Sequence, residues 1–272
     1  MRRTDSGMNQ RGASTDSDSF VDDFDGPALD EKIWFPHYLP QWSSRAKTAA
    51  SYRVADSLLV LDVPIDHNIW CEGLHQPPIR VSGMQSGTFS GPLGSTIGQQ
   101  PFAGHPTVME EQDSFRGLLV TGGRVEMRAA MTLSPRSMAA LWLVGFEDEP
   151  QRCGEICVAE IFGRSIGNDS DTVTVEVGMG VHPFRDPELV EDFATPRVSI
   201  DPTRFHDYAV VWRKEDATFL IDGVEHHRSR TLPRYPLQLM LAVFDFPEWS
   251  DGTDGDLVPE LAVDWIRATA DL

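Results

Sequence analysis

The chain lacks any hydrophobic run long enough to cross a membrane. Of its 272 residues, 40% are hydrophobic, yet nowhere do about 18 apolar residues follow one another, which is the length that a spanning helix needs. The N-terminus begins with Met1, Arg2 and Arg3, but the following stretch, residues 4–19, is polar and has no apolar segment of the kind found in signal peptides. We therefore expect no membrane partner, and no signal peptide is visible.

Basic residues are scarce. The sequence has 23 Lys and Arg against 42 Asp and Glu, which gives a formal net charge of −19. Nucleic acids and anionic membranes are polyanions and would be repelled by such a surface. The charge therefore argues against nucleic acid as a partner and is compatible with a neutral or a cationic substrate.

Cysteine is also scarce, with only Cys71, Cys153 and Cys157 present. An odd number excludes a fully paired disulfide framework. On a strand, Cys153 and Cys157 would lie about 13 Å apart, too far for a disulfide. We expect three free thiols that pack as small hydrophobic side chains.

What the sequence does contain is a series of short apolar runs separated by turn signals such as Asp222-Gly223. Several runs alternate between apolar and polar residues, and we find no convincing long amphipathic helix. The pattern predicts an all-β protein of two packed antiparallel sheets. The predicted strands are residues 58–63, 124–131, 139–146, 172–178, 208–212, 218–221, 237–244 and 261–268.

The organisation along the chain is simple. Residues 1–18 are rich in Ser, Asp, Gly, Arg and Asn, which predicts a disordered tail. Residues 19–272 are expected to form one β-sandwich domain. Three long segments, 90–114, 182–197 and 249–260, interrupt the strand rhythm. Loops of this length are often functional, and the alternative is surface decoration.

Two glutamates, Glu155 and Glu160, stand five positions apart in an apolar run. Because side chains alternate along a strand, this spacing alone places them on opposite faces as ordinary solvent-facing charges. A β-bulge around Val158 and Ala159 would take up one residue and bring both to one face. The carboxyl groups could then approach to about 5–5.5 Å, the separation found in retaining glycosidases.

Segments along most of the chain resemble, in order, the motifs of glycoside hydrolase family 16. The stretch from Glu155 to Glu160 resembles its bulged catalytic strand, which reads Glu-x-Asp-x-x-Glu. The resemblance implies a concanavalin-like β-jelly roll. The other matching segments are residues 20–26, 82–84, 123–129, 140–143, 205–212, 218–223 and 263–267.

The resemblance implies that Glu155 is the nucleophile and that Glu160 is the general acid and base. The sequence departs from the family at Cys157, which stands where the middle Asp is expected. A neutral thiol is a weak donor and a poor acceptor, so it cannot orient the nucleophile as a carboxyl group does. With one negative charge fewer, the pKa values of both glutamates are expected to fall toward ordinary values, which weakens the acid and reduces turnover.

Further residues are candidates for substrate binding. The resemblance places Trp142 beneath the sugar, with core packing as the alternative, and His182 in the cleft, with a place at a loop edge as the alternative. Arg80, Trp249 and Trp42 are candidates on weaker grounds, because core or surface packing explains each of them equally well.

Asp264 matches a position that ligates a structural calcium ion in some members of the family. Calcium takes oxygen ligands, which a carboxylate and nearby carbonyl groups can supply. No cofactor is expected to be required for catalysis, and calcium is the one metal that the resemblance suggests.

We therefore predict a retaining endo-β-glycosidase that acts on β-1,3- or mixed-linkage glucan, as a monomer. The alternative is a catalytically impaired carbohydrate-binding protein that uses the same cleft. Transglycosylation uses the same residues and stays open. The family is mostly extracellular, whereas this N-terminus shows no signal peptide, so the compartment also stays open.

Overall fold

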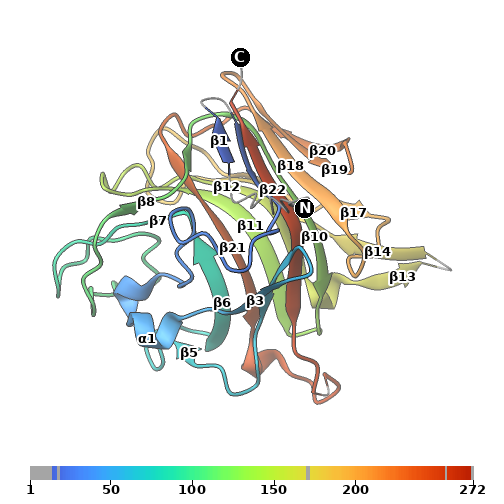
Figure 1. Cartoon of the computed structure of the whole chain (residues 1–272), viewed down its shortest axis with the longest axis horizontal. Coiled ribbons are helices and arrows are strands. Elements are labelled where there is room, and N and C mark those ends of the chain that lie inside the picture. Colours follow the sequence, from blue (N-terminus) through green and yellow to red (C-terminus); the bar gives the residue numbers. More distant parts are fainter. Residues whose placement is uncertain (1–13, 17–18, 170–171, 255, 271–272) are drawn as a thin grey trace, which may run out of the picture.

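The computed structural model describes residues 14–16, 19–169, 172–254 and 256–270, and over these the chain folds into two stacked antiparallel sheets (Figure 1). Among the described residues, the first sheet has nine strands, in the order β1-β2-β22-β10-β18-β19-β20, with β4 paired to β22 and β3 paired to β4. Their bounds are β1 (Ser14–Asp16), β2 (Ser19–Asp22), β3 (Ser51–Ala55), β4 (Leu58–Asp62), β10 (Gly123–Thr132), β18 (His206–Trp212), β19 (Ala217–Ile221), β20 (Val224–Ser229) and β22 (Glu260–Thr269).

The second sheet carries the candidate site. Within the described part of the chain it has eight strands, in the order β16-β15-β12-β11-β21-β6-β5, with β9 paired to β21. Their bounds are β5 (Ile69–Trp70), β6 (Ile79–Gln85), β9 (Leu119–Val120), β11 (Ser137–Gly145), β12 (Glu155–Phe162), β15 (Gly178–His182), β16 (Asp192–Ala194) and β21 (Leu237–Asp245).

Smaller elements decorate the two sheets. Strands β13 (Gly167–Asp169), β14 (Thr172–Glu176) and β17 (Arg197–Val198) form a small sheet, and β7 (Gly87–Thr88) pairs with β8 (Phe115–Arg116). Helix α1 (Arg45–Thr48) and the 3-10 turns η1 (Pro40–Trp42), η2 (Gly163–Ser165) and η3 (Pro247–Trp249) are short. None of the helices that the structure describes is long and apolar enough to span a membrane.

The core lies between the two sheets because alternate residues of each strand face it. On β10 the buried residues are every second one, as in Val125, Met127 and Ala129. On β11, Leu141 and Leu143 face the same core and are fully buried. Burial of this apolar surface is the main stabilising contribution to the sandwich.

The outer face of the eight-stranded sheet is covered as well, by loops instead of by a third sheet. Ala140, Trp142 and Met240 belong to a second apolar cluster on this face. Trp42 and Trp70, from the segments around α1 and β5, close that cluster from the loop side. This layer of loops over β11, β21 and β6 forms the wall of the candidate site.

The predicted fold class is confirmed, and each predicted strand corresponds to an observed one. The structure differs from the prediction of a disordered tail at residues 14–16, because these residues form β1 and pair with β2 in antiparallel register. Backbone hydrogen bonding to the edge of the first sheet gives this polar segment a regular conformation that composition does not signal. The rest of the predicted tail, residues 1–13 and 17–18, lies outside the described residues.

Candidate active site

Strand β12 contains a β-bulge at the predicted place. In its pairing with β11 the register passes from Cys157 to Ala159 and skips Val158, and in its pairing with β15 the register shifts between Cys157 and Glu160. Val158 and Ala159 are therefore both buried in the core, with exposed fractions of 1% and 0%. Glu155, Cys157 and Glu160 line one pocket on the outer face of the strand.

Glycines on the neighbouring strand allow this arrangement. Gly178 is the register partner of Glu160, and a Cβ there would lie 2.7 Å from the ring of Phe193 and 3.3 Å from the Cβ of Glu160. Gly180 has a φ of +145°, and its Cβ would lie 2.2 Å from the carbonyl oxygen of Asp192. Only glycine fits such close backbone approaches, so β15 can follow the bulged strand.

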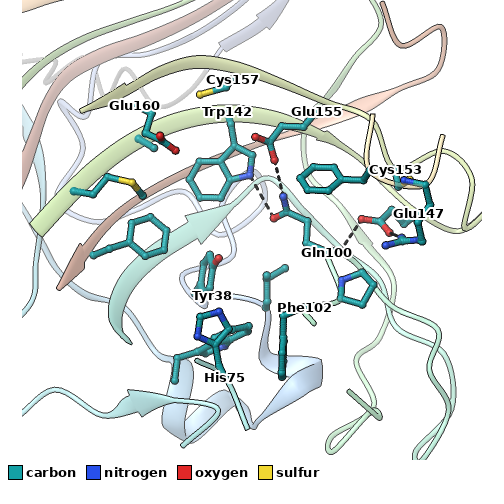
Figure 2. Close-up of a pocket in the computed structure, with 18 residues that line it drawn as sticks. Tyr38, His75, Gln100, Phe102, Trp142, Glu147, Cys153, Glu155, Cys157 and Glu160 are labelled. Atoms are coloured by element: carbon teal, nitrogen blue, oxygen red, sulfur yellow. Dashed lines mark hydrogen bonds and ion pairs between the residues drawn. The ribbon is translucent and has the colours of Figure 1, made fainter. Parts of the chain in front are cut away.

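The pocket has a volume of about 260 Å³ and combines carboxyl groups with aromatic side chains (Figure 2). Glu155, Cys157 and Glu160 come from β12, and Trp142 comes from β11. A mostly apolar cavity with a few converging polar groups is the usual form of a small-molecule or sugar site.

Burial raises the pKa values of the acidic groups in this pocket. The pKa of Glu155 rises to about 8, first because of desolvation and then because of repulsion from Glu160. Desolvation also raises the pKa of Glu160, and it raises the pKa of the Cys157 thiol well above its ordinary value. Both pKa values therefore lie above the ordinary value that the sequence led us to expect, because desolvation is the largest effect on each glutamate.

Gln100 is hydrogen-bonded to Glu155, and no motif or spacing in the sequence indicates it. Its side-chain nitrogen donates to Glu155 Oε2 at 2.8 Å, while its side-chain oxygen accepts from Trp142 Nε1 at 3.4 Å (Figure 2). Gln100 lies in the long segment 90–114, which was singled out only by its length. A β-sheet register cannot be used to predict which residue of such a loop reaches the cleft.

A second buried carboxylate, Glu147, supports this loop, and it too was missed. Its Oε1 accepts the backbone N–H of Gln100 at 2.7 Å, and its Oε2 pairs with the guanidinium of Arg185. Glu147 is 1% exposed, and desolvation raises its pKa to about 7 against the opposing effects of these two partners. Arg185, from the segment that follows β15, also lines the pocket.

Aromatic side chains from three segments of the chain form the opposite wall. Trp70 packs edge-on against Tyr38 at 5.3 Å, His75 at 5.1 Å and Phe102 at 5.2 Å between ring centroids. Burial raises the pKa of the Tyr38 hydroxyl, so this side chain stays neutral. Trp142 lies 6.5 Å from Tyr38 and completes an aromatic enclosure beside the carboxyl groups.

Of the predicted binding residues, Trp142 lines the pocket and is 5% exposed. His182 is the register partner of Glu155 on β15, and it stacks on Phe193 at 4.5 Å and pairs with Glu191 at 2.7 Å. His182 is thus next to the strand end that carries Glu155 but is not among the residues that line the pocket.

Two of the weaker candidates lie elsewhere. Arg80 forms an ion pair with Asp245 at 2.9 Å and donates to the carbonyl of His67, so its guanidinium is not in the pocket. Trp42 is 1% exposed, and its indole N–H donates to the carbonyl of Gln99 at 2.8 Å, so it packs in the second apolar cluster. Trp42 thus has the core packing role that was its alternative, whereas Arg80 is held by an ion pair.

Trp249 belongs to an aromatic stack that adjoins the pocket. It lies parallel to Phe246, with ring centroids 4.0 Å apart, and Phe162 lies 6.0 Å away. The guanidinium of Arg164 covers the Trp249 ring at 4.3 Å. Phe162 follows Glu160 by two positions on β12, so this stack borders the Glu160 side of the site.

Asp264, the predicted calcium ligand, is engaged by a cation. Its Oδ2 lies 3.2 Å from Nε of Arg128, which also pairs with Asp207. Over the described residues, no group of three or more His, Cys, Asp or Glu side chains is arranged to hold a metal ion. These side chains do not form a calcium site around Asp264, and calcium binding stays a prediction.

The cysteines are free thiols, as predicted, and all three are buried. Desolvation raises the pKa of Cys71 to about 12 and also raises the pKa of Cys153, so both thiols are protonated and unreactive at neutral pH. Cys157 donates weakly toward the carbonyl of Gly178 at 3.8 Å.

The fold and the two glutamates in one pocket are compatible with a glycoside hydrolase. A comparison with family models identifies the family: residues 120–267 match the model of "Glycosyl hydrolases family 16". This is more than half of the chain, which therefore belongs to that family. No curated protein matches the sequence.

Solved structures support the same assignment. A GlcNAcα1-4Gal-releasing endo-β-galactosidase from Clostridium perfringens is similar at 26% identity and a TM-score of 0.73, covering 97% of this chain. This chain spans 64% of the length of that protein. The laminarinase catalytic domain from Thermotoga maritima is similar in fold, at 16% identity and a TM-score of 0.61, over 96% of this chain and 100% of that one.

A third similar structure is described as an endo-acting O-glycanase expressed by members of the human gut microbiota to initiate mucin breakdown. It shares the fold at 20% identity and a TM-score of 0.60, over 93% of this chain and 99% of that one. The chain thus belongs to a family of glycosyl hydrolases, and the similar galactosidase and O-glycanase are both described as endo-acting enzymes.

Proposed function

We propose that this protein is a retaining endo-β-glycosidase in which Glu155 is the nucleophile and Glu160 the general acid and base. The observation that carries the proposal is the β-bulge of β12, which brings both glutamates into one pocket. Two carboxyl groups on one face of a strand, beside a sugar-sized aromatic pocket, are the minimum that a double displacement requires.

The first half of the reaction needs one proton on the pair of carboxyl groups. The raised pKa values of both glutamates keep one proton on the pair at neutral pH, and the reactive form is the one in which Glu160 carries that proton and donates it to the glycosidic oxygen as the bond breaks. Ionised Glu155 forms an ester with the anomeric carbon, and the alcohol leaves. Repulsion from Glu160 raises the pKa of Glu155, so the pair of carboxyl groups keeps its last proton at neutral pH.

In the second half, ionised Glu160 takes a proton from water, and the resulting hydroxide attacks the anomeric carbon. The ester to Glu155 breaks, and the β configuration is restored by this second inversion. The indole ring of Trp142 offers an apolar face to the sugar, because it lies in the pocket wall beside both carboxyl groups.

For the substrate, β-1,3- or mixed-linkage glucan is one candidate, supported by the laminarinase neighbours, which share only the fold. A β-galactosidic linkage is the second candidate. It is supported by the endo-β-galactosidase, which has both the higher identity and the higher TM-score of the three structures described above. Both candidates fit one catalytic pair and differ in the sugar that the aromatic wall accepts.

The test is product release from a panel of polymers: laminarin, lichenan, β-galactan and mucin O-glycans. We expect oligosaccharides from a subset of them, and no release by Glu155→Gln. Absence of release from every polymer would contradict the proposal.

A carbohydrate-binding protein that has lost catalysis is the alternative function, and it is motivated by Cys157. Calorimetry with the same polymers distinguishes the two. Binding without cleavage, by both wild type and Cys157→Asp, would establish the binding protein and exclude the enzyme.

A further inference from the structure

We propose that Gln100 is a positioning residue that orients the nucleophile Glu155 and favours its ionised state. It would thereby perform the task of the Asp that Cys157 replaces. This inference rests on the proposed function, because it assigns Glu155 the role of nucleophile. Its first observation is the hydrogen bond from Gln100 Nε2 to Glu155 Oε2, at 2.8 Å.

Cys157 cannot perform this task. It lies between the two glutamates along the strand, but its Sγ is directed at the carbonyl of Gly178, at 3.8 Å. Its raised pKa keeps the thiol neutral, and a neutral thiol is a weak donor. A substitute for the missing carboxyl group must therefore come from outside β12.

Trp142 determines which end of the Gln100 carboxamide meets Glu155. An indole N–H can only donate, so the atom of Gln100 that lies 3.4 Å from Trp142 Nε1 is the carbonyl oxygen. The NH₂ group must then face Glu155, to which it can only donate. This arrangement favours an accepting, ionised carboxylate and disfavours a protonated one that points its own proton at Gln100.

The loop around Gln100 is fixed before any substrate binds. The preceding residue, Gln99, is fully buried, and its side chain donates to the carbonyl of Phe146 at 3.1 Å and accepts from the N–H of Phe89 at 3.1 Å. The backbone N–H of Gln100 donates to Glu147 at 2.7 Å. Anchors at the preceding residue and at its own backbone N–H hold its side chain at the nucleophile, as a positioning group requires.

The groups around Glu155 show why such a donor matters. Three carboxylates raise its pKa by repulsion: Glu160 on the same strand, and Glu147 and Glu191 from neighbouring segments. Ionised Glu155 in turn raises the pKa values of the Cys157 thiol and the Tyr38 hydroxyl. His182 is its register partner on β15 and is paired with Glu191. Against burial and this acidic surrounding, the hydrogen bond from Gln100 lowers the pKa of Glu155.

The variant that tests the inference is Gln100→Met, which keeps the length of the side chain and removes the N–H donor. The matched control is Gln112→Met in the same loop, where the carboxamide contacts Arg45 and Glu110 instead of the carboxylate. The measurement is a ¹³C NMR titration of the Glu155 carboxyl, assigned with Glu155→Gln, which needs no substrate.

We expect the pKa of Glu155 to rise by about one unit or more in Gln100→Met, since a hydrogen bond to a charged group contributes that much. Wild type and Gln112→Met should titrate alike. An unchanged Glu155 titration in Gln100→Met would overturn the inference, whether or not the enzyme cleaves any polymer tested. If wild type cleaves no polymer but the pKa of Glu155 still rises in Gln100→Met, only the proposed function is contradicted.

With an active wild type, kinetics give a second readout. We expect kcat of Gln100→Met to fall about tenfold to a hundredfold with KM nearly unchanged, and the acid limb of the pH profile to move to higher pH. Adding Cys157→Asp to Gln100→Met should recover part of this loss. A rise in KM alone, with the pH limb unmoved, would overturn the inference and make Gln100 an ordinary substrate contact.

Discussion

Glu155 and Glu160 lie in one pocket although five positions separate them on β12. In a regular strand they would face opposite sides of the sheet. Val158 and Ala159 both turn into the core, which removes one step from the alternation. The energy of burying these two apolar side chains therefore also fixes the relative placement of the carboxyl groups, and the chemistry depends on it.

The first prediction separates the roles of the two glutamates. With an aryl glycoside that has a good leaving group, Glu160→Ala should still form the glycosyl-enzyme but hydrolyse it slowly, because the first step needs little acid. Azide should restore turnover and give a β-glycosyl azide. On polymer, the loss should be about 10²- to 10⁴-fold, the usual contribution of a general acid or base.

Glu155→Ala is the matched comparison for that experiment. It should form no glycosyl-enzyme, and azide should give a product of inverted configuration. A β-glycosyl azide from Glu155→Ala would show that the two roles are exchanged.

The second prediction concerns Cys157→Asp. Because Gln100 already donates to Glu155, restoring the carboxyl group in otherwise wild-type protein should change kcat/KM by less than about tenfold, or 1.36 kcal/mol of barrier. The measurement is kcat/KM on the best substrate of the panel. A rise of several hundredfold would show that Cys157 limits the enzyme and that Gln100 is no substitute.

The third prediction links the site to stability. Burial raises the pKa of Glu155 to about 8 and that of Glu147 to about 7, both above their ordinary value of 4.5. Between about pH 4.5 and 8 the folded state therefore binds more protons than the unfolded state. The free energy of unfolding then falls as the pH rises through this range. We expect Tm to fall over this range, with a loss of about a few kcal/mol in the free energy of unfolding.

Glu155→Gln tests this link because a glutamine carries no charge to desolvate. Its Tm should exceed that of wild type at pH 8 and approach it at pH 5, while activity is lost. Exposed Glu188→Gln is the control and should follow wild type at both pH values. An equal Tm of Glu155→Gln and wild type at pH 8 would show that Glu155 carries no burial penalty.

The fourth prediction concerns the aromatic stack beside the site. Trp249→Ala removes a ring that lies parallel to Phe246 and borders the Glu160 side of the pocket. If the stack binds sugar units beyond the cleaved bond, KM should rise about two- to tenfold on long oligosaccharides, since ring stacking contributes about 0.5–1.5 kcal/mol. An aryl monosaccharide or disaccharide should be cleaved as before, and an equal effect on short and long substrates would contradict this role.

The fold was predictable because it depends on local alternation. The strand at residues 124–131 and its partners alternate in the sequence as they do in the sandwich. The side chains of Val158 and Ala159 do not indicate a bulge. The sequence predicted one only because two glutamates five positions apart can share a site on a strand in no other way. The ordered resemblance along the chain made the bulge credible.

Other parts of the site depend on long-range contacts that no spacing encodes. Gln100 and Glu147 stand 47 positions apart and meet only because the loop folds over β11. Arg80 and Trp42 are candidates for substrate binding by residue type alone. In the structure Arg80 forms an ion pair with Asp245, and Trp42 is buried in an apolar cluster. The pKa values were misjudged because burial, which the sequence does not quantify, dominates them.

The central claim is that Glu155 and Glu160 perform a double displacement, and the most direct measurement is the configuration of the first product. Proton NMR during cleavage of the best polymer or oligosaccharide of the panel resolves the newly formed anomeric proton before mutarotation. We predict that the β anomer appears first and that the α anomer grows only later. Initial formation of the α anomer would contradict the account, because it would require an inverting site with a water molecule between more widely spaced carboxyl groups.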